Sequence, residues 1–371
     1  MDHVTYIHQL PQWPQFIWDS ARIGNLLAQF RYQQGMLGGR MEATGFDLRR
    51  ETMLLTYTND VIKSSEIEGE HLNYEQVRSS VARHLGLDTA GLISSPRDVD
   101  GVVEMVLDAT TNYQHPLTPD RLFAWHSLLF PGGRSGFNKI TIADWRKGVM
   151  QIVSGRMGKE RIHFQAPSPE IVPQEMQRFM DWYNEDQNID LVLKAGIAHI
   201  WFETIHPFDD GNGRIGRALC DLLLARSENT SKRFYSLSAQ IQKEREDYYQ
   251  HLEHTQKNTH MDITYWLEWY LNCLLRAVQT ANDSLNRVFH KTHYWNTLNK
   301  MHLNERQRFM LNHLLDEKLY GSLTSTKWAK MCKCSQDSAS RDIQDLIEKN
   351  ILKKGTAGGR STAYELVEIG G

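Results

Sequence analysis

Cysteine, net charge and long apolar runs are all scarce in this sequence, and each scarcity excludes a class of protein. Four cysteines in 371 residues are too few for the disulfide framework of a small secreted domain, so reduced thiols are expected. The 42 basic and 45 acidic side chains nearly cancel, which leaves no global signal for a polyanionic partner. No apolar run reaches membrane-spanning length and the amino terminus lacks a basic leader with an apolar core, so the sequence predicts a cytoplasmic protein.

The few cysteines do not form a metal-binding pattern either. Cys332 and Cys334 lie two positions apart, but no CxxC pair or Cys/His cluster accompanies them. Cys220 and Cys273 are isolated in the sequence. The pattern therefore favours buried or incidental thiols over a structural zinc site.

The chain is long enough for two or three domains, and changes of pattern divide it into three regions. Residues 1–92 open with aromatics and prolines and continue with apolar residues at helical spacing. Residues 93–290 carry long amphipathic stretches with few strand-like runs, and residues 295–371 change pattern again. We predict a mainly α fold, with a helical N-terminal region, a helical central domain and a smaller C-terminal module.

One stretch of the central region has the pattern of strands. From Lys147 to Pro167, apolar and polar residues alternate on both sides of a glycine-rich turn. Alternation around such a turn is typical of two antiparallel strands. The sequence therefore predicts a β-hairpin inside an otherwise helical domain.

The C-terminal module resembles a winged helix-turn-helix. Ser335 is the expected N-cap of its second helix, and the glycine-rich segment 353–366, with its lysines and arginine, supplies the wing. Such a helix can enter a DNA major groove while the wing contacts phosphate. However, this helix carries Asp342 and Asp345, and such modules also bind proteins, so DNA binding and protein contact both stay open.

Two apolar helical stretches flank a short loop that suits an anion. The loop and the start of the second stretch, residues 206–217, read HPFDDGNGRIGR. Gly211, Asn212 and Gly213 let a ligand approach the backbone closely. The helix that follows offers unpaired N–H groups and the positive end of its dipole, so phosphate is the expected guest.

Four side chains of the same loop supply the chemistry of phosphoryl transfer. Arg214 and Arg217 are three positions apart on a helix, so both can contact one phosphate-bearing ligand. His206 has a near-neutral intrinsic pKa and is suited to accept a proton from an attacking hydroxyl. Asp210 is a hard oxygen ligand that suits Mg²⁺ held jointly with nucleotide phosphates.

Taken together, residues 206–217 resemble the signature of the Fic (filamentation induced by cAMP) family. The resemblance implies a protein adenylyltransferase, which moves AMP from ATP to a Ser, Thr or Tyr hydroxyl and releases pyrophosphate. It assigns His206 as the base on the target hydroxyl and Asp210 as the Mg²⁺ ligand. The family also implies a possible homodimer.

The same resemblance assigns each phosphate a place. The segment from Gly211 to Gly213 would hold the α- and β-phosphates. Arg214 would contact the β-phosphate and Arg217 the γ-phosphate. Relatives that transfer the γ-phosphate carry lysine at the position of Gly213, so the sequence GNGR favours transfer of a nucleoside monophosphate.

Two further features are assigned by the resemblance. The predicted hairpin corresponds to the family's flap, where an extended target segment pairs with the strand edge formed by Arg161, Ile162, His163 and Phe164.

Downstream, Tyr248 and Tyr249 stand where relatives have tyrosines near the adenine pocket, so Tyr248 is a candidate nucleotide-binding residue. Gln256 replaces an asparagine found in some relatives. A plain role in an amphipathic core explains both tyrosines equally well.

An upstream segment, residues 59–72, resembles the family's inhibitory motif through Ser64, Glu68 and Gly69. Serine and glutamate four apart share a helical face, and the glutamate would pair with Arg217 and displace the γ-phosphate. The plain alternative is a solvated helical face that carries several glutamates. Placement before the loop resembles the class with an N-terminal inhibitory helix.

The sequence thus predicts an autoinhibited, Mg²⁺-dependent protein adenylyltransferase that also modifies itself. One alternative is the reverse reaction, in which Glu68 positions water and AMP is removed from a modified protein. A second is a different nucleotide donor. A third, from another class, is a regulator that senses a nucleotide and binds DNA through the C-terminal module.

Overall fold

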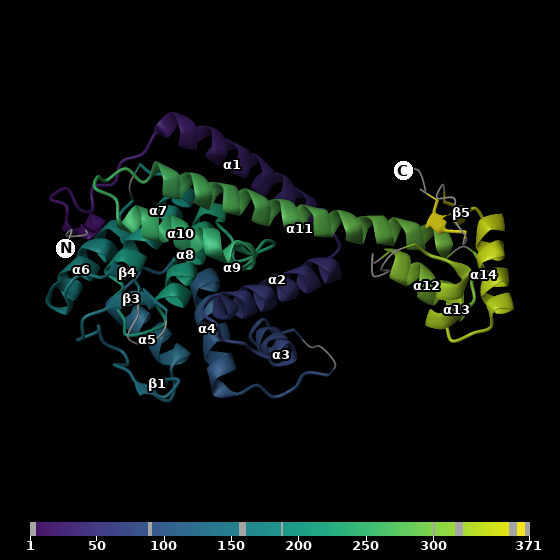
Figure 1. Ribbon diagram of the computed structural model, residues 1–371, viewed down its shortest axis with the longest axis horizontal. Coiled ribbons are helices and arrows are strands. Elements are labelled where there is room, and N and C mark those ends of the chain that lie inside the picture. The colour runs from purple at the N-terminus through teal and green to yellow at the C-terminus, as the bar shows by residue number, and fades with distance from the viewer. Residues whose placement is uncertain are drawn as a thin grey trace. The chain divides into compact units, whose positions relative to one another are not determined.

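The protein is built almost entirely from helices, as a computed structural model shows for residues 5–87, 91–155, 161–186, 188–299, 301–315, 322–355 and 362–367. Within these residues, fourteen α-helices are accompanied by three short antiparallel strand pairs (Figure 1). The mainly helical class is therefore confirmed. None of the described helices is both long and apolar enough to cross a bilayer.

Two compact units divide the chain, Met1–Ala281 and Asn282–Gly371. The boundary lies inside the long helix α11 (Thr264–Leu298), so α11 contributes to both units. The other helices of the first unit are α1 (Ser20–Glu42), α2 (Phe46–Ile67), α3 (Tyr74–His84), α4 (Arg97–Thr111), α5 (Pro119–Leu129), α6 (Val172–Asn184), α7 (Leu191–Ile205), α8 (Asn212–Glu228), α9 (Leu237–Lys243) and α10 (Arg245–Gln256).

Helices α7 and α8 pack closely on each other and carry a large part of the buried core of the first unit. Every side chain of α7 from Val192 to Ile205 is buried, which agrees with a segment that is apolar around its whole circumference. Pro207 follows two residues after Ile205 and has no N–H to extend the helix. The loop of residues 206–211 therefore starts where the sequence forces α7 to end.

Helix α2 contacts α8 of this pair and also packs on α3, α4 and α9. Its last residue is Ile67, and Glu68 follows as the C-cap, with Gly69 in the left-handed region at φ +84°. The C-terminal end of α2 therefore lies next to the N-terminus of α8. This contact joins residues almost 150 positions apart in the chain.

The predicted hairpin is present in the first unit. Strand β3 (Gln151–Ser154) pairs with β4 (Arg161–Gln165), with a register shift after Ile152. Phe164 of β4 is buried against Tyr6 near the N-terminus. The tip between the strands lies outside the described residues, and a smaller pair, β1 (Arg134–Ser135) and β2 (Asn138–Lys139), precedes it in the chain.

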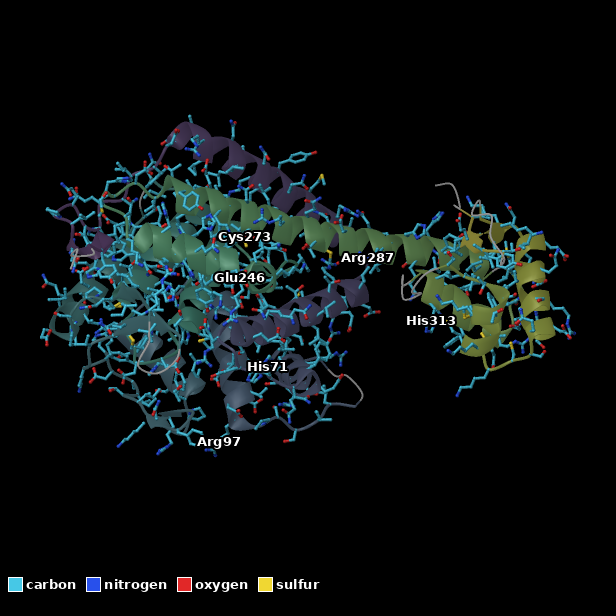
Figure 2. All side chains as sticks on the ribbon, viewed as in Figure 1. His71, Arg97, Glu246, Cys273, Arg287 and His313 are labelled. Atoms are coloured by element: carbon cyan, nitrogen blue, oxygen red, sulfur yellow. The ribbon has the colours of Figure 1, made fainter. Side chains whose placement is uncertain are left out.

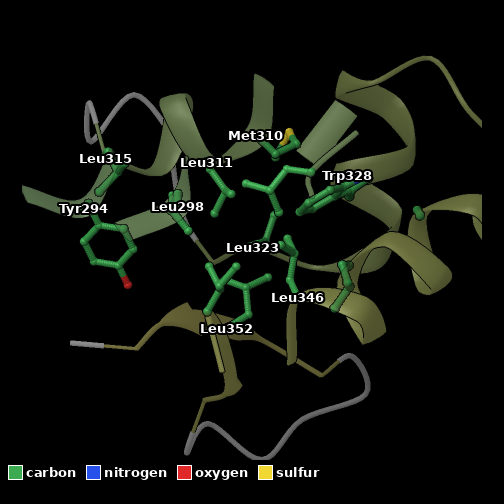
Figure 3. Close-up of a cluster of buried hydrophobic side chains, with 13 residues drawn as sticks. Tyr294, Leu298, Met310, Leu311, Leu315, Leu323, Trp328, Leu346 and Leu352 are labelled. Carbon is green, nitrogen blue, oxygen red and sulfur yellow. The ribbon is translucent and has the colours of Figure 1, made fainter. Parts of the chain in front are cut away.

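The second unit has its own apolar core, formed by three helices, the end of α11 and a strand pair (Figure 3). Its elements are α12 (Glu305–Leu315), α13 (Ser325–Met331), α14 (Gln336–Glu348), β5 (Leu352–Lys354) and β6 (Tyr364–Leu366). Trp328 is fully buried at the centre, and Ser335 caps α14 through Ser338 N, as expected. The turn of the expected wing lies outside the described residues, and the winged-helix assignment stays a prediction.

The four cysteines are free thiols, as expected from their scarcity. Cys220 and Cys273 are buried, the latter on α11 (Figure 2), whereas Cys332 and Cys334 are partly exposed. Within the described residues, no group of three or more His, Cys, Asp or Glu side chains has the arrangement of a metal site.

Candidate active site

The loop begins with a residue in an unfavourable backbone conformation. His206 is in the left-handed region at φ +51°, which is costly for a residue with a Cβ. Arg146 compensates by donating from Nε to the His206 carbonyl at 2.8 Å, and its own backbone N–H donates to the Pro207 carbonyl at 2.8 Å. Arg146 is 1% exposed, so its guanidinium serves the loop and not the solvent.

Arg146 was not found by sequence reasoning, because nothing in its own neighbourhood marks it. It precedes the hairpin and resembles any surface arginine in the sequence. Its side chain also donates to the Ile205 carbonyl at 3.4 Å and to two carbonyls on either side of the hairpin, Gly148 at 2.8 Å and Pro167 at 2.5 Å. The arginine therefore ties the base of the hairpin to the loop that carries His206.

The end of the loop and the start of α8 form a rigid cradle. Gly211 is in the left-handed region at φ +82°, and an added Cβ there would lie 2.9 Å from the Phe130 ring. Asn212 bonds Phe208 twice, since its Oδ1 accepts from the Phe208 N–H at 2.9 Å and its Nδ2 donates to the Phe208 carbonyl at 2.8 Å. Asn212 thus shapes the loop with its side chain and leaves only its backbone N–H for a ligand.

The imidazole of His206 is in the protonation state of a base. Its side chain is 15% exposed, and burial lowers its pKa to about 4. The ring is therefore neutral at physiological pH. Its Nδ1 lies 3.4 Å from the Glu203 carbonyl oxygen, which only accepts, so Nδ1 carries the hydrogen and Nε2 keeps a free electron pair.

The two neighbouring aspartates of the loop have different roles. Asp209 accepts from the Thr141 N–H at 2.8 Å and so fastens the loop to the preceding segment. Asp210 accepts from the Gly211 N–H at 2.5 Å and from the Ser135 hydroxyl, and its side chain is 39% exposed. Only Asp210 is therefore free enough to contact a ligand.

Arg217 is buried and fully engaged by the end of α2. Its Nε donates to Ser64 Oγ at 2.9 Å, its Nη2 to the Ser64 carbonyl at 2.7 Å and its Nη1 to Glu68 Oε1 at 2.8 Å. Burial alone would lower the pKa of Arg217, but the Glu68 charge raises it above its usual value. Glu66, by contrast, pairs with Lys63 on its own helix at 2.7 Å.

The Glu68 carboxylate lies directly over the glycine of the expected phosphate site. A Cβ added to Gly213 would be 2.1 Å from Glu68 Oε1 and 3.0 Å from Arg217 Nη1. Any atom that approaches the backbone at Gly213 therefore competes with Glu68 for the same space. Glu68 therefore bonds an arginine of the loop, and its inhibitory role stays a prediction.

Arg214 is engaged by a second carboxylate from the same turn, Glu70, which sequence reasoning did not assign. Arg214 Nη1 donates to Glu70 Oε2 at 2.5 Å, and the arginine side chain is 2% exposed. Its guanidinium also lies 5.1 Å over the Phe130 ring. Both arginines of the loop therefore bond glutamates that are two positions apart.

The tyrosines downstream are in contact with this cluster. Tyr248 is 1% exposed, and its hydroxyl is 2.8 Å from His199 Nε2 on α7. The Tyr249 hydroxyl donates to the Ile67 carbonyl at 3.2 Å, and Gln256 donates to the Glu203 carbonyl at 3.2 Å. Tyr248 thus has the contacts of a core residue, and its role toward a nucleotide stays a prediction.

The flap residues divide between the interior and the surface. Arg161 and Ile162 are exposed, whereas Phe164 is buried. Glu253 of α10 accepts from Arg161 at 3.0 Å and contacts His163 Nδ1 at 2.7 Å. The outer edge of β4 is thereby fixed to α10, and target docking on this strand stays a prediction.

Two family models match the chain. Residues 116–224, which contain the whole loop, match the Fic/DOC family. Residues 6–87, which contain Ser64 and Glu68, match a domain of unknown function (DUF4172).

Curated protein adenylyltransferases are similar to this chain over short segments. The chain is 42% identical over 64 residues to the "Probable protein adenylyltransferase aq_aa38" of Aquifex aeolicus (strain VF5), which is 17% of this chain and 20% of the relative. It is 36% identical over 81 residues to the protein adenylyltransferase fic-1 of Caenorhabditis elegans, which is 20% of this chain and 16% of the relative. The chain thus spans a fifth or less of the length of these relatives.

Solved structures extend the likeness at the level of the fold. A Fic family protein from Desulfovibrio desulfuricans G20 is 23% identical, with a TM-score of 0.52 over 94% of this chain and 97% of that chain. A Fic domain-containing signaling protein from Bacteroides thetaiotaomicron is 19% identical, with a TM-score of 0.50 over 70% of this chain and 96% of that chain. At these identities the likeness shows the fold alone.

Proposed function

We propose that the protein transfers AMP from ATP to hydroxyl side chains of proteins, itself included, because residues 116–224 match the Fic/DOC family. The observation that carries this proposal is a neutral imidazole beside two buried arginines at a glycine-lined helix N-terminus. The curated relatives are named protein adenylyltransferases, which supports the same reaction.

In this reaction His206 Nε2 takes the proton from the target hydroxyl, whose oxygen then attacks the α-phosphorus of ATP. The new oxygen–phosphorus bond forms as the bond to the β-phosphate oxygen breaks, and pyrophosphate leaves. Arg214 and Arg217 neutralise the charge of the leaving group. Positioning and charge neutralisation supply most of the acceleration.

Asp210 fits a Mg²⁺ ion held jointly by the protein and the nucleotide. Mg²⁺ in nucleotide enzymes is bound by one or two carboxylates and by phosphate oxygens, so a single partly exposed aspartate is sufficient. When bound, the ion would add charge neutralisation on the phosphates. Ser135, which donates to Asp210, would keep that carboxylate oriented.

We further propose that the turn of residues 68–70 holds the enzyme off. Glu68 occupies the space over Gly213 and saturates Arg217, the arginine expected to bind the γ-phosphate. A nucleotide in that site would have to displace the Glu68 carboxylate. Activation then consists of moving the turn at the end of α2.

The donor and the direction are tested with labelled nucleotides on the Glu68→Gly protein. Label from α-³²P-ATP should reach protein in the presence of Mg²⁺. Label that arrives only from γ-³²P-ATP would eliminate AMP transfer. Preferential labelling by UTP, GTP or CTP would show that another nucleotide is the donor. Release of AMP from a modified protein without net labelling would show that the enzyme removes AMP.

We predict that Glu70→Gln raises transfer beyond what Glu68→Gly alone achieves. The substitution removes the charge from the carboxylate that bonds Arg214, so this arginine becomes available to the β-phosphate. Charge-assisted bonds contribute about 1.5–3 kcal/mol, but Glu70 is 44% exposed, so we expect a gain of about 2- to 10-fold. Initial self-labelling rates of the single and double variants measure it.

The matched control is Glu75→Gln, an exposed glutamate in the first turn of α3. It removes the same charge near the same turn without touching an arginine of the loop, so its labelling rate should equal that of the parent. Equal rates for Glu70→Gln and its parent would show that the Arg214 contact has no inhibitory effect.

A second candidate function, DNA contact by the C-terminal unit, is favoured by the side chains of α14. Of the two aspartates that argued against it, Asp342 is 5% exposed and accepts from Arg306 at 2.7 Å. Asp345 is partly exposed, and its carboxylate accepts from Lys349 at 2.6 Å. The exposed residues of α14 are Gln336, Asp337, Ser340, Arg341, Gln344 and Glu348.

The charge of the unit supports the same proposal. Residues 282–371 contain fourteen Lys and Arg against ten Asp and Glu, although the whole chain has a net charge of -3. The C-terminal unit therefore has a positive net charge within an acidic chain, and the exposed face of α14 is polar. Both features favour binding to the negatively charged backbone of a nucleic acid. This function is separate from AMP transfer, and either can stand without the other.

We predict that Arg341→Ala weakens binding of the full-length protein to random-sequence DNA duplexes by roughly 5- to 100-fold, since one arginine contact to DNA is worth about 1–3 kcal/mol. Gel-shift titrations at several salt concentrations measure it. The control is Arg287→Ala, an exposed arginine on α11 (Figure 2) that removes the same charge. Absence of binding at low salt, or equal losses in both variants, would favour a protein-contact role for α14.

A further inference from the structure

Glu203 is a buried carboxyl beside the base, and the reaction proposed above gives it no role. It lies in the last turn of α7, three residues before His206, with a side chain that is 8% exposed. Its Oε2 is 3.6 Å from His206 Nδ1. Among the described residues, its Oε1 has no hydrogen-bond partner, which is unusual for so buried a polar atom.

The neighbouring helix is shaped to admit this carboxyl. A Cβ added to Gly216 of α8 would lie 2.7 Å from Glu203 Oε1 and 3.3 Å from the His199 ring. Any other residue at position 216 would therefore push the carboxyl or the ring away. Close packing of this kind without a stabilising bond indicates that the carboxyl has a purpose other than holding α7 and α8 together.

We propose that Glu203 is a positioning residue for His206, which fixes the imidazole plane and, when ionised, stabilises the imidazolium formed as the target hydroxyl loses its proton. The proposal rests on the assignment of His206 as the base. Before proton transfer, Nδ1 carries the ring's hydrogen on the side of Glu203. After transfer both ring nitrogens carry hydrogen. A negatively charged carboxylate 3.6 Å away then stabilises the new positive charge of the ring.

The protonation of Glu203 gives this role a pH signature. Burial and the Glu68 charge raise the pKa of Glu203 to about 8, whereas Arg217 acts in the opposite direction. Arg146, Asp210 and Glu68 also act on His206 itself. Glu203 is therefore mainly neutral at pH 7, and transfer should rise with pH as the carboxyl ionises. Removal of Glu68 should move this rise somewhat below pH 8.

The test compares Glu203→Gln with its parent, both in the Glu68→Gly background. We expect ATP affinity from calorimetry to stay within about 2-fold. We expect kcat at pH 8 to fall roughly 10- to 100-fold, which is less than the roughly 10²- to 10⁴-fold contributed by a general base, because Glu203 acts through His206. The rise of kcat between pH 6 and 8.5 should disappear. Glu203→Asp should restore part of that rise. A uniform loss of activity with an unchanged pH profile would overturn the proposal, as would no loss at all.

A second measurement detects the interaction between Glu203 and His206 without enzymatic turnover. In the parent, the ¹³C-labelled ring of His206 should change its chemical shift as Glu203 ionises above pH 6, and in Glu203→Gln it should not. An unresponsive His206 ring in the parent overturns the positioning role even if transfer is normal. If the parent is inactive but its His206 ring responds to pH, the proposed AMP transfer is wrong and the contact between Glu203 and His206 stands.

Stability provides a fold control. Glu203 ionises near pH 4.5 when unfolded but only near 8 when folded, so the unfolded state holds fewer protons between these values. Stability from this group is therefore present below pH 4.5 and lost as pH rises to 8. Glu203→Gln should lessen the decline of Tm over this window, which also shows that the variant folds.

Discussion

Replacing His206 by alanine is expected to lower transfer from α-labelled ATP by roughly 10²- to 10⁴-fold, the usual contribution of a general base. The Glu68→Gly background makes the loss measurable. ATP affinity should be nearly unchanged, because the phosphates are expected to contact Arg214, Arg217 and the start of α8, and none of these contacts uses the imidazole. Initial rates and calorimetric binding, measured on the same preparation, separate the two effects.

The pH dependence of the parent checks the same assignment. Burial lowers the pKa of His206 to about 4, so the imidazole is neutral and able to accept a proton at every higher pH. Transfer should therefore not be lost through His206 until pH falls toward 4. The control His71→Ala removes an exposed histidine near the end of α2 (Figure 2) and should leave the rate unaffected. Retained transfer in His206→Ala would remove the base assignment.

Glu68→Gly is expected to raise self-labelling by roughly 10- to 100-fold. The substitution removes a carboxylate that bonds a 1% exposed arginine and fills the space over Gly213. A bond between charged groups contributes about 1.5–3 kcal/mol, and each 1.4 kcal/mol is a factor of ten. Glu68 itself is 28% exposed, which places the expected gain toward the lower end of that range.

Glu66→Gly is the matched control for this gain. Glu66 lies in the last turn of α2, two positions before the C-cap Glu68, and its carboxylate pairs with Lys63 and not with an arginine of the loop. Both variants weaken the same helix end by introducing glycine. A similar activation by Glu66→Gly would mean that loosening α2 matters and that the Glu68 carboxylate does not. No activation by Glu68→Gly, with ATP binding intact, would contradict the inhibitory contact.

The position of the loop before α8 could be predicted because the residues that set it are neighbours in the sequence. Pro207 ends one helix, Gly211 permits the turn into the next, and two arginines three apart on a helix must share a face. These constraints act over a few residues and are visible in the sequence. The mainly helical fold was predictable for the same reason, since amphipathic spacing is a property of each helix alone.

The partners that hold the loop were not predictable. Arg146, Ser135 and Glu70 are each at least 60 positions away in the chain from the loop residue that they bond, and none has a distinctive neighbourhood. Glu203 is close in sequence, but its spacing does not show that its carboxyl is buried. The packing of Asp342 and Asp345 was not predictable either, since the sequence of a helix does not show which of its acidic side chains bond a neighbouring residue.

The sequence by itself determined a glycine-rich loop between two helices, with His206 at its entrance and two arginines on one helical face, because helix ends and helical spacing are fixed by neighbouring residues. Only the tertiary structure decided what restrains the loop. Packing of α2 against α8 sets Glu68 over Gly213, sets Glu70 against Arg214 and buries Arg217 between Ser64 and Glu68. Such contacts depend on how helices that are distant in the sequence pack into one core, and the spacing of residues within one helix does not predict that packing.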